Sequence, residues 1–263
     1  MLLAIDVGNT NIVLGVFERS ELIRSWRLQT VRDRTADELG LTVGGLFANS
    51  GIDRARIHGI VLGSVVPPVT NTVVGMLWKD FLRKPLVVDP AANSGMPIRY
   101  SNPSEVGADR IVNAIAAFDH YGCAGRPLIV CDFGTATTLD AVSGVGEYLG
   151  GAICPGVSIS ADALFQRAAR LPRIEVRKPD TVIGRTTVGA MESGLFFGYV
   201  GMVEGLVRRM NAELGGHAVC VATGGLAIVI APETGLFDHV DVELTLQGLR
   251  IVWERNQTRA HSV

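Results

Sequence analysis

The chain has 263 residues, 48% of them hydrophobic, so it can bury a core large enough for one large domain or two of ordinary size. Its formal net charge of -2 and isoelectric point near 6.2 provide no broad basic field, which argues against nucleic acid or an anionic membrane surface as a partner. Small molecules and other proteins remain as candidate partners.

The first third of the chain alternates short apolar segments with turn residues. It predicts strands over residues 2–5, 12–17 and 22–28, a helix over 35–49, a strand over 59–64 and a helix over 69–82. The uncharged run 57–78 is long enough for a membrane span, but Pro67, Pro68 and Asn71 divide it into a strand, a turn and a helix. Asp6 interrupts the first apolar run too early for a signal peptide, so we expect a cytoplasmic protein without a membrane segment.

The same alternation continues to the end of the chain. Further strands are predicted over residues 86–88, 128–132, 147–152 and 218–223, and further helices over 110–120, 187–214 and 244–256. Strands that alternate with helices predict an α/β fold in which helices cover the sheet faces. The turn-rich stretch 92–105 is the clearest boundary, so we expect two domains, 1–105 and 106–263.

An internal repeat is the strongest sign of organisation. I-D-V-G-N-T-N-I-V-L at residues 5–14 resembles C-D-F-G-T-A-T-T-L-D at 131–140, with Asp6 aligned on Asp132 and Gly8 on Gly134. The two copies lie nearly half the chain apart. They predict a duplicated domain whose two halves form a cleft lined by both turns.

The repeated turn has the composition of a phosphate site. Glycine lets the backbone approach a ligand closely, and exposed N–H groups can donate to phosphate oxygens. Four side chains could donate as well: Thr10, Asn11, Thr135 and Thr137. Asp6 and Asp132 would repel phosphate unless a cation lay between, so we interpret them as cation-holding residues. The alternative is an Asx-type turn between hairpin strands, which two copies at half-chain spacing make the weaker interpretation.

Other nucleotide and metal motifs are missing from the sequence. There is no Gly-Lys dipeptide for a Walker A loop and no G-x-G-x-x-G between a strand and a helix. The four cysteines form no C-x-x-C pair, so a zinc site is not expected. V-A-T-G-G-L-A at 221–227 follows a predicted strand, and it could pack against adenine or ribose, or be an ordinary connection to a helix.

Three of these motifs resemble those of a known superfamily. D-V-G-N-T-N, D-F-G-T-A-T and A-T-G-G are similar to the first phosphate, second phosphate and adenosine motifs of the acetate kinase, sugar kinase, Hsc70 and actin superfamily. G-S-V-V-P, N-P-S-E-V-G-A-D-R and G-G-A-I-C-P-G extend the resemblance to the type III pantothenate kinases. The resemblance implies duplicated ribonuclease H-like (actin-like ATPase) domains with an interdomain nucleotide cleft.

The resemblance also implies a reaction and its cofactors. Type III pantothenate kinases use ATP to phosphorylate the primary hydroxyl of pantothenate, which gives 4'-phosphopantothenate in the first step of coenzyme A biosynthesis. By this resemblance Asp132 binds a monovalent cation, potassium or ammonium, and Mg²⁺ accompanies ATP. The family is homodimeric, with the acceptor site completed at the interface.

Site residues are implied in the same way. The implied ATP contacts are Asp6, Val7, Gly8, Asn9, Thr10, Asn11, Ile12, Val13 and Thr135. The implied pantothenate contacts are Tyr100, Gly107, Ala108, Asp109, Arg110 and Thr187. From the residues themselves, Asp109 can accept or orient the hydroxyl proton, and Arg110 can pair with the pantothenate carboxylate.

Each of these assignments has a structural alternative. Asp109 could be the N-cap of the following helix, and Thr187 could cap the next long one. Tyr100 could be a loop aromatic packed on the core. The glycine-rich helix 187–214 allows close helix packing, against either its own core or a second subunit.

Two other functions are compatible with the motifs. One is a different kinase of the superfamily, acting on a sugar, acetate or glycerol, which the short chain and G-A-D-R disfavour. The other is a nucleotide-sensing regulatory protein without transfer activity, which an intact Asp109 disfavours.

Overall fold

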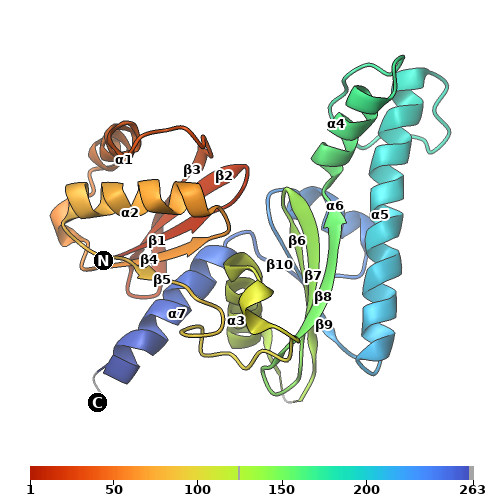
Figure 1. Cartoon of the computed structure of the whole chain (residues 1–263). Helices are drawn as coiled ribbons and strands as arrows, with labels where there is room; N and C mark the ends of the chain where they lie inside the picture. Colours follow the sequence, from red (N-terminus) through yellow and green to blue (C-terminus); the bar gives the residue numbers. More distant parts are fainter. Residues whose placement is uncertain (124, 261–263) are drawn as a thin grey trace. The chain divides into compact units, whose positions relative to one another are not determined.

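The computed structural model describes residues 1–123 and 125–260, which form two compact units (Figure 1). The first unit comprises Met1–Ala116 and the chain from Leu244 onward, and the second comprises Ala117–Glu243. The predicted halves, 1–105 and 106–263, were divided at the turn-rich stretch 92–105, and that division stays a prediction. In the part of the chain described, no helix has both the length and the apolar character that crossing a membrane requires.

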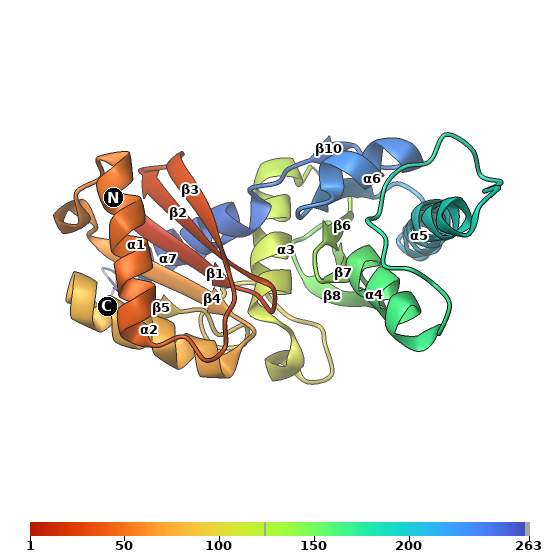
Figure 2. The ribbon, with the colours of Figure 1, turned by 90° about the horizontal axis from the view of Figure 1, so that it is seen from above.

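A five-stranded sheet forms the centre of the first unit. Its strand order is β3 (Glu21–Gln29), β2 (Asn11–Glu18), β1 (Leu2–Val7), β4 (Gly59–Ser64) and β5 (Leu86–Val87). The pairs β3–β2 and β2–β1 are antiparallel, whereas β1–β4 and β4–β5 are parallel. Helices α1 (Ala36–Ser50) and α2 (Pro67–Phe81) lie side by side on one face (Figure 2).

The alternation of side chains along β1 explains the two faces of this sheet. Leu3, Ile5 and Val7 are buried in a core with residues of α1 and α2. On the opposite face, glycines let α7 (Leu244–Ala260) approach closely, since a Cβ at Gly59 would lie only 2.3 Å from the Trp253 ring. This packing joins the last helix of the chain to its first strands.

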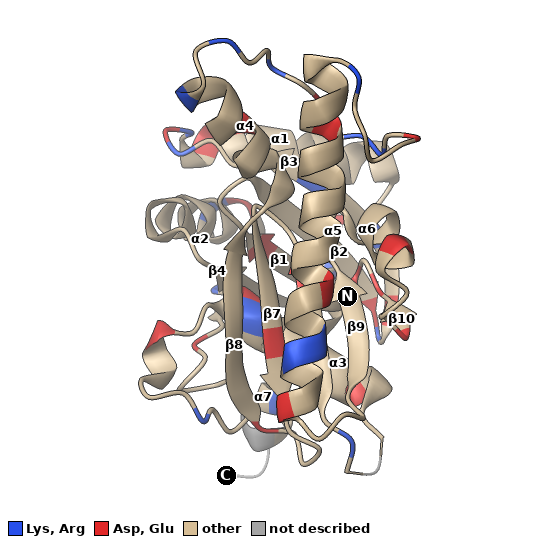
Figure 3. Ribbon diagram, turned by 90° about the vertical axis from the view of Figure 1, so that its right-hand side faces the viewer, with Lys and Arg blue, Asp and Glu red and all other residues tan. Residues whose placement is uncertain are grey.

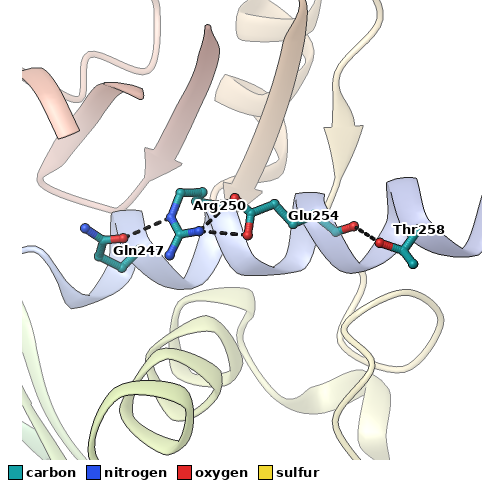
Figure 4. A network of polar contacts seen from close by, with 4 residues as sticks. All are labelled: Gln247, Arg250, Glu254 and Thr258. Atoms are coloured by element: carbon teal, nitrogen blue, oxygen red, sulfur yellow. Dashed lines mark hydrogen bonds and ion pairs between the residues drawn. The ribbon is translucent and has the colours of Figure 1, made fainter. Parts of the chain in front are cut away.

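Helix α7 carries a buried arginine whose charge is satisfied within the helix (Figure 4). Arg250 is 8% exposed, and its Nε donates to Gln247 Oε1 at 3.1 Å. Its Nη1 lies 2.7 Å from both carboxylate oxygens of Glu254. The guanidinium also lies 5.9 Å from the centre of the Phe17 ring of β2, so this polar network packs directly on the sheet.

The second unit repeats the topology of the first. Its strand order is β10 (His239–Val240), β9 (Val219–Thr223), β6 (Leu128–Phe133), β7 (Ala136–Val142) and β8 (Tyr148–Pro155). β6 pairs antiparallel with β7 and parallel with β9, as β1 does with β2 and β4. The shared order confirms the duplicated α/β fold that the sequence repeat predicted.

Helices and one long connection complete the second unit. The helices are α3 (Ala108–Tyr121, shared with the first unit), α4 (Val157–Arg167), α5 (Thr187–Glu213) and α6 (Ala227–Thr234). Residues of α5 and α6 form an apolar core with Ile129, Cys131 and Phe133 of β6. The segment between α4 and α5, rich in arginine, has no helix or strand (Figure 3). Lys178 of this segment forms a 2.7 Å ion pair with Glu233.

Most of the predicted helices and strands are present. The elements that were not predicted lie in segments that mix polar and apolar residues. β7, β10 and α4 were not predicted, and helix α3 begins at Ala108, two residues before its predicted start. In β7 the side chains of Thr137, Thr138 and Asp140 conceal the apolar pattern. The strand is specified by its pairing with β6 and β8, the strands that precede and follow it in the chain.

Candidate functional site

The first phosphate turn connects β1 to β2 and has a fixed backbone. The N–H of Gly8 donates to the carbonyl oxygen of Asn11 at 2.9 Å, which closes the turn. Thr30 holds it from the side, because its N–H donates to the Thr10 carbonyl at 2.9 Å and its Oγ donates to the Gly8 carbonyl at 2.7 Å. Thr10 itself is exposed at the tip. The turn therefore presents polar groups to solvent on a rigid frame.

The segment that contains Asp109 packs beside this turn through one residue of the first unit, Val65. The N–H of Val65, just after β4, donates to the Val7 carbonyl at 3.1 Å. A Cβ at Gly107 would lie 3.4 Å from Val65 Cγ1 and 2.4 Å from Asp109 Oδ1. The G-A-D-R segment thus packs at the same end of the first sheet as the turn, and Gly107 leaves the space that the Asp109 carboxylate occupies.

Asp109 is a partly buried carboxylate in the first turn of α3. It is the second residue of the helix and not its N-cap, yet its Oδ1 still accepts a hydrogen bond from the Arg110 N–H at 2.8 Å. Burial raises the pKa of Asp109, although the hydrogen bond from the Arg110 N–H and the Arg110 charge oppose this effect. A raised pKa makes the ionised carboxylate a stronger proton acceptor.

The second phosphate turn connects β6 to β7 and is held by Gly156, which follows β8. The Gly134 N–H donates to the Ala136 carbonyl at 3.2 Å, and the Gly156 N–H donates to the Thr135 carbonyl, also at 3.2 Å. A Cβ at Gly156 would lie 2.2 Å from that Thr135 oxygen, so only glycine allows this approach. Gly134 and Thr135 are exposed.

The Asp132 carboxylate lies between the second phosphate turn and the A-T-G-G turn. Gly224 has φ +91°, and a Cβ there would lie 2.4 Å from Asp132 Oδ1 and 2.7 Å from the Phe133 nitrogen. A Cβ at Gly134 would lie 3.6 Å from the same Asp132 oxygen. Two motifs that are separated by about 90 residues in sequence therefore meet at one carboxylate in the second unit.

A comparison with protein families identifies this arrangement of motifs. A sequence model described as "Type III pantothenate kinase" matches residues 2–209, which include both phosphate turns and the G-A-D-R segment. The chain belongs to the type III pantothenate kinase family. A type III pantothenate kinase of Moorella thermoacetica is 56% identical over 256 residues, which cover 97% of this chain and 100% of the relative.

Solved structures show the same fold at low sequence identity. The activator of 2-hydroxyisocaproyl-CoA dehydratase from Clostridium difficile, with bound ADPNP, is 11% identical over 99% of this chain and 97% of that chain, with a TM-score of 0.55. A ROK hexokinase from Thermus thermophilus is 16% identical over 98% of this chain and 99% of that one, with a TM-score of 0.50. These likenesses confirm the actin-like ATPase and sugar kinase fold class.

Tyr100 and Thr187, which only the family resemblance singles out, are both on the surface. Tyr100 is 36% exposed in an irregular segment, so it is not a core aromatic. Thr187 is the first residue of α5 but not its cap, because Thr186 Oγ accepts the hydrogen bond from the Gly189 N–H at 3.0 Å. The capping alternative is therefore wrong for Thr187, and its exposed side chain is accessible to a ligand.

Three residues that support the motifs of this kinase family were not identified from the sequence. They are Thr30, which fixes the first turn, Val65, which links that turn to the G-A-D-R segment, and Thr223, which pairs with Asp132 across β6 and β9. Val65 lies in G-S-V-V-P and Thr223 lies in A-T-G-G, but neither motif singled out the residue itself. Thr30 and Val65 act through contacts that are distant in sequence.

Proposed function

We propose that this protein transfers the terminal phosphoryl group of ATP to the primary hydroxyl of pantothenate, giving 4'-phosphopantothenate and ADP in the first step of coenzyme A biosynthesis. Family membership over nearly the whole chain supports the reaction. The observation that carries the proposal is the partly buried Asp109 carboxylate, in a segment whose Gly107 packs on Val65 beside the first phosphate turn. We place the reaction in the cytoplasm.

The proposed ATP contacts are the residues of the first turn and one of the second. They are Asp6, Val7, Gly8, Asn9, Thr10, Asn11, Ile12, Val13 and Thr135. Backbone N–H groups and hydroxyls of these turns stabilise phosphate oxygens. As the family resemblance implies, Mg²⁺ arrives with ATP in this proposal and is held largely by the phosphates of the nucleotide.

Asp109 acts as the general base in this scheme. Its carboxylate accepts the proton of the pantothenate hydroxyl as that oxygen forms a bond to the terminal phosphorus. The bond from that phosphorus to the bridging oxygen breaks, and ADP leaves with the electron pair. Tyr100, Gly107, Ala108, Arg110 and Thr187 are the proposed contacts that orient pantothenate, with Arg110 facing its carboxylate.

A monovalent cation, potassium or ammonium, fits the surroundings of Asp132. The residue supplies one carboxylate, next to hydroxyl side chains and a glycine turn. One carboxylate beside uncharged oxygens suits a monovalent ion, whereas a protein Ca²⁺ site contains several carboxylates. When bound there, the cation would neutralise negative charge close to the phosphates.

Asp132→Asn should therefore weaken potassium activation. The change keeps the size of the side chain and removes its charge, so the potassium concentration needed for half-maximal activity should rise by about tenfold or more. Asp162→Asn is the matched control, because Asp162 is a half-exposed carboxylate on α4 that pairs with Arg173. Initial rates measured against potassium concentration test this, and an unchanged dependence in Asp132→Asn would contradict the assignment.

We also propose a homodimer, for which apolar side chains on the second unit provide support. β8 is an edge strand on which Leu149 and Ile153 are exposed, and Phe165 of α4 is exposed as well. Exposed apolar side chains on an edge strand favour association. Light scattering coupled to gel filtration should give twice the 28.0 kDa mass of the chain, and a monomer at micromolar concentration would refute the proposal.

The proposed reaction is tested by measuring ADP release from magnesium ATP with potassium present. The acceptors are pantothenate, a panel of sugars, glycerol, acetate, and none. Release only with pantothenate supports the proposal. Release with a sugar or acetate instead would favour another kinase of the superfamily, and no acceptor-dependent release would favour a nucleotide-sensing regulatory protein.

A further inference from the structure

Thr223 holds a buried hydroxyl that the fold itself does not use. The residue ends β9 and is only 1% exposed. In the described part of the chain, its Oγ has no hydrogen-bond partner. Burying a hydroxyl without a partner costs free energy, so such a group in a native protein needs an explanation, such as a bound water, an ion or another ligand.

The strand register places this hydroxyl beside Asp132. Thr223 is the partner of Asp132 in the parallel β6–β9 pair, and Thr138 is its partner in the antiparallel β6–β7 pair. Partners in a sheet project their side chains from the same face. The neighbours Cys131, Phe133 and Ala222 pack into the apolar core on the other face. Thr223 and Asp132 therefore point away from that core together.

The next residue brings the backbone to the same place. Gly224, with φ +91°, approaches so closely that a Cβ would lie 2.4 Å from Asp132 Oδ1. The Asp132 carboxylate, the Thr223 hydroxyl and the turn after β9 therefore form one cluster of oxygen-bearing groups.

The first unit lacks this hydroxyl at the equivalent position. There the partner of Asp6 across the parallel β1–β4 pair is Gly63, and Leu249 of α7 fills the space beside it, with its Cδ2 3.0 Å from where a Cβ would lie. The hydroxyl is thus not required by the repeated fold. It distinguishes the surroundings of Asp132 from those of Asp6.

We propose that the Thr223 hydroxyl oxygen is a ligand, together with the Asp132 carboxylate, of the monovalent cation. The inference rests on the proposed function, which assigns the cation to Asp132. Potassium is bound in proteins largely by uncharged oxygens that replace its hydration shell, and a threonine hydroxyl provides such an oxygen. One carboxylate with hydroxyl neighbours gives the low-charge site that a monovalent ion requires.

The test uses thallium(I), a potassium mimic, as the probe. Binding of thallium(I) to the full-length protein with magnesium ADP is measured by thallium NMR, with choline salts keeping the ionic strength constant. Thr223→Val removes the hydroxyl at nearly constant volume, and Thr223→Ser keeps it. We expect thallium affinity to fall by about tenfold or more in Thr223→Val and to change by less than about twofold in Thr223→Ser.

Each outcome decides the inference. Equal affinity in the wild type and Thr223→Val, or no thallium binding by the wild type, would overturn it. The hydroxyl has no hydrogen bond to lose, so Thr223→Val should fold; if it does not, Thr223→Ala is measured in its place under the same criterion. Because binding is measured without pantothenate, failure of the kinase activity would show separately, in the assay of ADP release.

Discussion

Asp109→Asn should reduce the turnover number for pantothenate phosphorylation by about 10²–10⁴-fold, with little change in ATP affinity. The asparagine keeps the size of the side chain and can still accept the hydrogen bond from the Arg110 N–H, but it cannot take a proton from the acceptor hydroxyl. Steady-state kinetics together with calorimetric titration of ATP separate the two effects. Near-normal turnover would remove Asp109 as the base.

The same residue should determine the acid limb of the pH profile. A general base must be ionised, and burial raises the pKa of Asp109. Activity should therefore be lost as the pH falls through this raised pKa, at a higher pH than an ordinary carboxylate would give. The residual activity of Asp109→Asn should lack this limb. Asp53→Asn is the control, because Asp53 caps a short 3₁₀ helix away from the turns, and it should retain the wild-type profile.

Gly224→Ala should destabilise the protein by about 2–4 kcal/mol and weaken potassium activation. The new Cβ combines two costs, a left-handed backbone at φ +91° and contacts of 2.4 Å with Asp132 Oδ1 and 2.7 Å with the Phe133 nitrogen. Because the Phe133 contact is with backbone, the turn must shift, and the Asp132 carboxylate must move with it. Urea unfolding gives the stability, and rates against potassium concentration give the effect on the site.

Gly235→Ala separates the two costs of that substitution. Gly235 also has a positive φ, +61°, but nothing lies within 4 Å of a Cβ built there. Its replacement should cost only about 1 kcal/mol and leave potassium activation unchanged. If Gly224→Ala were no more destabilising than Gly235→Ala, close packing of Gly224 against Asp132 would not explain why glycine is needed.

The internal repeat predicted more of the fold than the hydrophobic patterns did. The alignment of Asp6 with Asp132 implied two equivalent turns, and both sheets do share one strand order around β1 and β6. The patterns identified strands such as β1 and β4, whose apolar runs are continuous. They did not identify β7, because Thr137, Thr138 and Asp140 interrupt its apolar pattern and the strand is specified by its pairing with β6 and β8.

The site was predictable where chemistry is local in sequence, and not where it depends on pairing. Asp109 is identifiable because it lies in the G-A-D-R segment, and the phosphate turns are identifiable from their composition. Thr30 lies outside the quoted motifs, and Thr223 lies in A-T-G-G without being singled out there. The contact of Thr30 with Gly8 and the register of Thr223 with Asp132 reveal their places. The A-T-G-G motif directed attention to its glycines, whereas the buried hydroxyl beside them became visible only in the structure.

The most direct test of the proposed reaction follows the phosphoryl group itself. ATP labelled in its terminal phosphate is incubated with the protein, magnesium, potassium and pantothenate, and the products are identified by mass spectrometry and phosphorus NMR. We predict that labelled 4'-phosphopantothenate forms in an amount equal to the ADP, and that its formation requires Asp109. Formation of ADP with the label in inorganic phosphate, or on another acceptor, while pantothenate stays unmodified would contradict the account.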